Sequence, residues 1–257
     1  MFGFLIKKTF FDMWDNMLNI VVMNLGFLLI ASAMLYIPFV LSFNLLLASI
    51  AVVVGIIVIT LYTGAVAYTV GEYADYRAVS FKEFFSFFKQ SFKSSLALGI
   101  VAVVEVIILR VVFPFYFQMG GLLGLGAMAA IFWVSVIWAL ASQYYFPVAK
   151  RLDTDIKKIF RKSFILFFDN TLYSVGLGIV SLIILTVSLF TAFLLPGVAS
   201  FLLFHQVACK LRMYKYDYLE ENPDTKKRDI PWAALLLDDK DKVGPRTLKG
   251  MLFPWKD

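Results

Sequence analysis

The 257-residue sequence is strongly apolar, since 61% of its residues are hydrophobic and only 16% are charged. Globular domains carry roughly 25% charged residues, and the mean hydropathy of +0.81 excludes an ordinary water-soluble protein. The apolar residues come in runs of about 18 or more, the length at which a helix crosses a bilayer. A β-barrel would show alternating segments of about ten residues instead. The composition therefore predicts an all-α membrane protein.

The net charge of +6 belongs to the membrane part of the chain. From Tyr214 onward nine basic and nine acidic residues cancel, which leaves 15 basic and 9 acidic residues before that point. Basic residues in short loops are attracted to anionic lipid headgroups. We therefore expect a lipid bilayer, and no nucleic acid, as the partner of this charge.

Six apolar spans are predicted along the chain, separated by polar or turn-forming residues. In order they cover about residues 17–38, 45–68, 95–117, 122–143, 172–193 and 196–210. Residues 1–213 then form a six-helix transmembrane domain, and residues 214–257 form a polar tail. A signal peptide is the alternative for the first span, because Ala31-Ser32-Ala33 resembles a cleavage site, but the apolar run continues beyond it.

Lysine and arginine alternate between the loops. The lead-in to the first span has two, residues 72–94 have four and residues 150–162 have six, whereas the loops after the first, third and fifth spans have none. Basic loops stay on the cytoplasmic side of a membrane. The pattern therefore predicts that both termini, and with them the tail, are cytoplasmic.

The third span is preceded by an amphipathic segment. At about 100° per residue, five Phe side chains fall on one stripe and the lysines fall on the opposite side. The stripe is Phe81, Phe84, Phe85, Phe88 and Phe92, and the basic side includes Lys82, Lys89 and Lys93. An aromatic face opposite a lysine face is typical of a helix that lies in the membrane interface.

Related lead-ins precede the first and fifth spans. KKTFFDMWDNMLNIVV from Lys7 and RKSFILFFDNTLYSVG from Arg161 share a basic pair, a Phe and then Asp-Asn-x-Leu. The pattern predicts three repeated units, each an amphipathic interfacial helix followed by a transmembrane hairpin. The alternative is that aromatic and basic residues collect at any cytoplasmic membrane interface.

The tail contains two apolar islands, Ile230–Leu237 and Met251–Trp255. Disordered segments are poor in aromatic residues, so Trp232 and Trp255 predict that the tail docks. The membrane domain, the lipid surface and a partner protein are the three candidate surfaces.

No catalytic constellation is visible in the sequence. It has no GxSxG, Walker or dinucleotide-binding loop and no cluster of residues at metal-ligand spacing, so we expect neither an enzyme nor a cofactor. The glycine-rich stretch Gly120–Gly126 fits a turn or close helix packing better than phosphate binding. His205 and the single cysteine, Cys209, share a helical face, but two ligands without a third make a poor metal site.

Glu105 is the sharpest candidate for a functional residue. It lies near the middle of the third span, where an ionisable group costs about 2.5 kcal/mol or more and normally faces a partner or a wet cavity. His205 lies at a similar depth in the sixth span, so we predict that the two meet at the centre of the bundle. Arg110 follows Glu105 on the same helix, where it either reaches the interface or folds back toward the carboxylate. The alternative is a polar pair, or a protonated Glu105 bonded to a backbone carbonyl, that only fixes packing.

Residues 62–99, YTGAVAYTVGEYADYRAVSFKEFFSFFKQSFKSSLALG, resemble the YesL-type family of bacterial membrane proteins. The likeness includes the first span and covers residues 1–100 best; beyond them only hydropathy and length agree. The Gly-Pro-Ala run of that family is partly kept here as Thr63-Gly64-Ala65, and the long tail departs from the pattern. The resemblance implies a bacterial inner-membrane protein linked with ABC-type carbohydrate uptake.

Two functions follow from these observations. The first is a non-enzymatic protein that acts by interaction as an accessory to ABC transporter subunits, with the Phe-rich segment and the tail as contact surfaces. The second is a secondary transporter or channel that uses Glu105 and His205. A transporter usually shows broken helices and several polar residues at mid-membrane depth, and their scarcity in the sequence favours the first. The sequence leaves the oligomeric state open.

Overall fold

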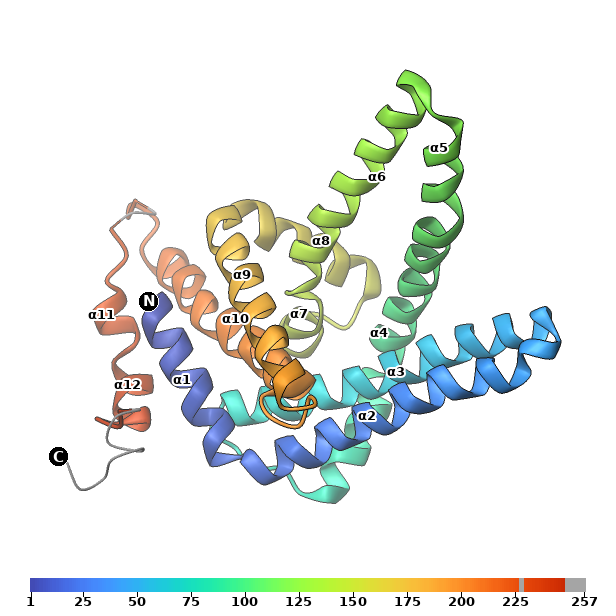
Figure 1. Ribbon diagram of the computed structural model, residues 1–257. Coiled ribbons are helices and arrows are strands. Elements are labelled where there is room, and N and C mark those ends of the chain that lie inside the picture. The colour runs from blue at the N-terminus through green and yellow to red at the C-terminus, as the bar shows by residue number, and fades with distance from the viewer. Residues whose placement is uncertain (227–228, 248–257) are drawn as a thin grey trace.

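The computed structural model describes residues 1–226 and 229–247. Trp255 and the second apolar island of the tail lie outside these described residues. Within them every regular element is a helix and no strand occurs, which confirms the all-α prediction. Figure 1 shows two long hairpins that diverge from a common base, where the first helix and the tail helices also lie.

The elements follow one another with short connections. In chain order they are α1 (Phe2–Asp15), α2 (Met17–Val40), η1 (Leu41–Phe43), α3 (Leu45–Ala74), α4 (Phe81–Ile107), the π-helical turn η2 (Ile108–Val112), α5 (Phe113–Met119), α6 (Gly121–Ser142), α7 (Tyr145–Arg151), α8 (Ile156–Asp169), α9 (Thr171–Phe190), α10 (Gly197–Glu221), α11 (Trp232–Leu235) and α12 (Leu237–Val243).

Five helical segments within the described part of the chain are long and apolar enough to cross a membrane, which makes this a multi-pass membrane protein. They are Met17–Phe43, Leu45–Ala74, Phe81–Met119, Gly121–Arg151 and Thr171–Phe190. The predicted sixth span, residues 196–210, lies in α10, which is not among the five. The reason is composition, since α10 carries Lys210, Arg212 and Lys215 and continues to Glu221.

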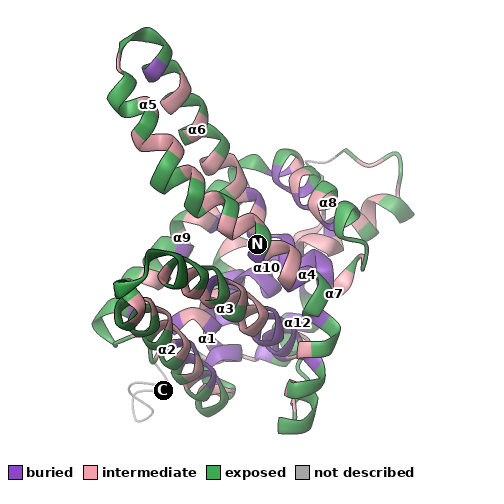
Figure 2. Cartoon of the chain, turned by 90° about the vertical axis from the view of Figure 1, so that its right-hand side faces the viewer, coloured by how far each residue is buried: buried purple, intermediate pink, exposed green. Residues whose placement is uncertain are grey.

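The hairpins differ in burial between their tips and their base (Figure 2). On α3 the residues from Gly64 to Val70 are all buried, whereas large side chains near the tip are exposed, Leu45 by 81%. At the base α3 and α4 approach so closely that a Cβ on Gly64 would collide with Ser91 and Ser95 of α4. Small residues permit such close contact between membrane helices. The base therefore holds the fold, and the outer hairpins present apolar side chains to lipid.

The helix α10 lies at the centre of the base. It packs against α1, α2, α3, α7 and α9, and it is buried almost continuously from Leu202 to Cys209. Its polar side chains reach out to the helices around it: Lys210 donates to the Ala74 carbonyl at 3.0 Å and Gln206 to the Ala67 carbonyl at 3.0 Å. The least apolar of the long helices is thus enclosed by the apolar ones.

The predicted interfacial segment before the third span is not a separate helix. It begins with a capping box in which Ser80 and Glu83 exchange hydrogen bonds, and α4 then runs without a break to Ile107. Ser94 does not interrupt it, because its hydroxyl bonds within the helix to the Ser91 carbonyl. In contrast, α1 and α8 each end at an Asp-Asn pair, with Asn16 and Asn170 as the breaks before α2 and α9.

The N-terminus of α10 is capped by side chains of other helices. Asn24 of α2 accepts a hydrogen bond from the Ala199 amide at 2.8 Å and donates to the carbonyls of Leu194 and Pro196, each at 2.9 Å. Ser188 accepts from the Gly197 amide at 2.9 Å. First-turn amides have no partner within their own helix, so Asn24 joins α2 to the turn between α9 and α10.

We predict that Asn24→Ala destabilises the protein by about 2–4 kcal/mol, because three buried partners lose their hydrogen bonds at once. Thermal unfolding of the purified protein in mild detergent measures the loss. Asn44→Ala is the control, since Asn44 caps its own helix α3 at an exposed site and its removal costs about 1 kcal/mol. Equal losses in the two variants would show that the hydrogen bonds of Asn24 to the turn between α9 and α10 do not stabilise the fold.

Candidate functional site

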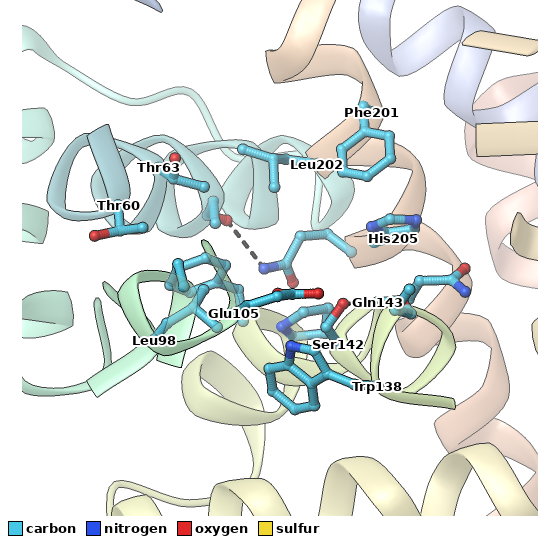
Figure 3. Close-up of a pocket in the computed structure, with 16 residues that line it drawn as sticks. Thr60, Thr63, Leu98, Glu105, Trp138, Ser142, Gln143, Phe201, Leu202 and His205 are labelled. Carbon is cyan, nitrogen blue, oxygen red and sulfur yellow. Dashed lines mark hydrogen bonds between the residues drawn. The ribbon is translucent and has the colours of Figure 1, made fainter. Parts of the chain in front are cut away.

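A cavity of about 280 Å³ lies where the two hairpins diverge, between α3, α4, α6, α7 and α10. Figure 3 shows labelled side chains from α3, α4, α6 and α10 around it. Its apolar wall includes Leu98, Phe146 and Phe201. Its polar side chains are Thr60, Thr63, Glu105, Trp138, Ser142, Gln143, His205 and Gln206.

The two residues predicted to meet at the bundle centre line this same cavity. Glu105 enters from α4 and His205 from α10. They are not hydrogen-bonded to each other: His205 Nε2 lies 2.8 Å from Ser181 Oγ of α9, and its ring packs against Phe201 with the centroids 4.4 Å apart. Arg110 does not line the cavity, because it is exposed and lies beyond Glu105 in the π-helical turn η2.

The hydroxyl groups of the cavity-lining Thr60, Thr63 and Ser142 all donate hydrogen bonds to backbone carbonyls. Thr60 donates to the Ile56 carbonyl at 2.9 Å, Thr63 to the Ile59 carbonyl at 2.7 Å, and Ser142 to the Ala139 carbonyl at 2.9 Å. A hydroxyl has one hydrogen and two acceptor lone pairs. These three groups therefore add no free donor to the cavity.

Two buried glutamines also have their side-chain donors bonded to backbone carbonyls. Gln206 is fully buried, and its amide nitrogen donates a hydrogen bond to the Ala67 carbonyl. Gln143 is 7% exposed and donates to the carbonyls of Leu140 and Ser174, at 3.2 and 3.4 Å. The Oε1 atoms of both have no hydrogen-bond partner. Buried carbonyl-type oxygens are nearly always paired in native proteins, so these two mark a place where a further group belongs.

Glutamines 143 and 206 are the functional candidates that the sequence reading missed. Gln143 closes the predicted fourth span and Gln206 lies beside His205, so both positions are visible as polar interruptions of apolar runs. Their meeting at one cavity depends on how the intervening helices place the end of α6 beside α10, which no local pattern encodes. The π-helical turn that follows Glu105 was also missed; π-helical turns occur frequently at functional sites.

A second polar cluster joins the tail to the base. Asp239 of α12 is 2% exposed and lies 3.2 Å from Lys210 Nζ and 2.8 Å from the Tyr214 hydroxyl. Lys8 of α1 pairs with Asp12 at 2.8 Å and places its ammonium 3.6 Å from the centre of the Tyr76 ring. These contacts hold the tail against α1, α3 and α10.

Burial controls the electrostatics of this cluster. It raises the pKa of Asp12 to about 6, although the Lys8 ammonium opposes the change. Burial acts on Asp239 in the same direction, but Lys210 and the hydroxyls of Tyr214 and Tyr76 outweigh it and hold the pKa of that carboxyl below its ordinary value. Asp239 is thus the stable anion around which the neighbouring cations gather.

Some of the residues that were predicted to form docking and interfacial surfaces pack against the core, and others are exposed. Trp232 packs against the core at the base, with the Arg212 guanidinium 5.6 Å from its ring centre. Phe84 and Phe88 pack against Tyr62, whereas Phe81, Phe85 and Phe92 are exposed. The lysines of α4, which are Lys82, Lys89 and Lys93, are exposed as well.

No family model, curated protein or solved structure matches this chain. The likeness to the YesL-type family therefore stays a prediction. Among residues 1–226 and 229–247 no group of three or more His, Cys, Asp or Glu could hold a metal ion. The functional argument rests on the geometry of the cavity.

We predict that Gln206→Leu leaves the melting temperature unchanged or raises it, because removal of the unpartnered buried oxygen offsets the lost hydrogen bond to the Ala67 carbonyl and leucine keeps most of the side-chain volume. The matched control is Asn170→Leu. Asn170 is a buried amide whose partners include the Leu166 carbonyl and Lys215 Nζ, so its loss costs about 2–3 kcal/mol. A large loss in Gln206→Leu would show that Gln206 serves the fold.

Proposed function

We propose that this chain is a membrane transporter that binds a small polar solute in the cavity between its hairpins. The observation that carries the proposal is the polar lining of that cavity, which combines Glu105 and His205 with two glutamines, Gln143 and Gln206, whose buried Oε1 atoms lack partners. Each such group costs about 1–3 kcal/mol while it lacks a partner. A solute that supplies hydrogen-bond donors removes this cost when it binds.

The surrounding structure supports a solute site. The cavity lies between helices from both hairpins, and binding sites of membrane transporters occur between such repeated elements. Glu105 lies three residues before the start of the π-helical turn η2. The sequence had weighed against a transporter because broken helices and mid-membrane polar residues were scarce. The π-helical turn and the two glutamines add irregular backbone and polar side chains at or near the cavity.

The proposed topology has six spans, with α10 as the sixth and both termini in the cytoplasm of a bacterial inner membrane. Within α10, the first part from Gly197 to Cys209 is apolar apart from groups that face other helices, and the charged residues follow it. The basic residues of the base, including Lys150 and Arg151, then lie on the cytoplasmic side. The shared Asp-Asn ends of α1 and α8 support repeated units of helix plus hairpin, with the middle unit fused into α4.

A role as an accessory to ABC transporter subunits is the second candidate. The exposed Phe81, Phe85 and Phe92 favour it, since aromatic side chains beside lysines suit both a lipid interface and a partner protein. Copurification of stoichiometric transporter subunits from native membrane would favour this role over solute transport.

We predict that Ala102→Phe abolishes solute binding without unfolding the protein, because Ala102 lines the cavity and a phenyl ring fills much of it. The measurement is the rise in melting temperature caused by millimolar butylammonium, glucose or butyrate. At least one of these should stabilise the natural sequence and the control Ala130→Phe, whose site is exposed on the same hairpin. The solute that binds should also enter proteoliposomes. Absence of any response, or a response that survives in Ala102→Phe, would contradict the proposal.

The proposed topology predicts which single cysteines react from outside the cell. In a Cys209→Ser background, Phe43→Cys and Met119→Cys at the hairpin tips should react with a membrane-impermeant maleimide in intact cells. Lys89→Cys and Asp224→Cys at the base should react only after the cells are opened. Labelling of Lys89→Cys in intact cells would overturn the assigned orientation.

A further inference from the structure

We infer that the cavity selects a small organic cation, a protonated amine, with Glu105 as its counter-ion. This inference rests on the proposed solute-binding function and adds the chemical class of the solute. It comes from an inventory of charges, donors and aromatic rings in the cavity.

The charge of the cavity is uncompensated. Among its lining residues Glu105 is the single Asp, Glu, Lys or Arg. Within residues 1–226 and 229–247 the Glu105 carboxylate forms no hydrogen bond or ion pair. A carboxylate at membrane depth without a partner is costly, so the site favours a positively charged ligand.

The hydrogen-bonding groups point to a donor-rich ligand. The Oε1 atoms of Gln143 and Gln206 lack partners, and the hydroxyls of Thr60, Thr63 and Ser142 add no free donor, since their hydrogens bond to backbone carbonyls. An ammonium group carries up to three donors and no acceptor. An anion would instead meet one carboxylate and an array of acceptors.

The aromatic residues of the cavity suit a cation as well. Trp138, Phe146 and Phe201 line it, and a cation over an aromatic face is attracted by the negative potential of the ring. The volume of about 280 Å³ lies near the lower end of small-molecule pockets, which begin at about 300 Å³. The occupant is therefore a compact amine.

A neutral polyol fits less well than an amine of the same size. It supplies donors to the oxygens, but it leaves the charge of Glu105 uncompensated and adds hydroxyl lone pairs that the cavity has few donors to meet. Trp138 contributes one donor, the indole N–H. Charge therefore distinguishes the two classes of solute.

The test compares butylammonium with its neutral analogue butanol, with glucose and with butyrate, by calorimetric titration of the full-length protein in lipid nanodiscs. We expect butylammonium to bind and the other three to bind at least about tenfold more weakly. Glu105→Gln preserves the size of the side chain and should weaken butylammonium binding by roughly 10- to 100-fold, because it removes a charge-assisted contact. Glu220→Gln, at an exposed position of α10, should leave binding unchanged.

The outcomes separate this inference from the proposed function. Binding of glucose or butyrate that is blocked by Ala102→Phe, with no preference for butylammonium, would overturn the cation assignment and leave the solute site intact. Undiminished butylammonium binding in Glu105→Gln would also overturn the assignment. If none of the four probes binds, the cavity is no solute site and both proposals fail.

Discussion

The fold depends on the enclosure of α10, the least apolar of the long helices, by apolar ones. A polar group buried away from water costs free energy unless it finds a partner, so each polar side chain of α10 restricts which helix can lie beside it. Gln206 requires a carbonyl of α3, His205 a hydroxyl of α9, and Lys210 the acids of α3 and α12. Even the N-terminus of the helix requires Asn24 from α2.

These requirements explain why the molecule is tight at its base and open at its tips. Among the described residues no hydrogen bond or ion pair joins the outer parts of the two hairpins, and lipid solvates their apolar side chains as well as another helix would. The hairpins are therefore free to diverge, and the cavity opens at the point where they separate. The Oε1 atoms of Gln143 and Gln206 remain without partners there, and sites that break a packing rule are where function is expected.

The sequence predicts only some of the residues of the candidate site. Glu105 stands out because a lone acid in an apolar run is costly wherever the run lies in a membrane, and His205 stands out by the same reasoning. Gln143 and Gln206 look unremarkable in the sequence, because uncharged amides are tolerated in membrane helices and their meaning depends on what they face. Arg110 attracted notice for its charge, yet the helix turns it away from the cavity.

The sequence by itself determined the helical class and the approximate positions of five of the six predicted spans, because hydropathy and breaking residues act locally. Only the tertiary structure decided that α4 continues through its Phe-rich segment, that α10 lies at the centre, and that five helices meet at one cavity. Those outcomes depend on which surfaces pack together. Contacts between residues as distant as Asn24 and Ala199 leave no periodic trace in the chain, since each partner is specified by the shape and polarity of the other.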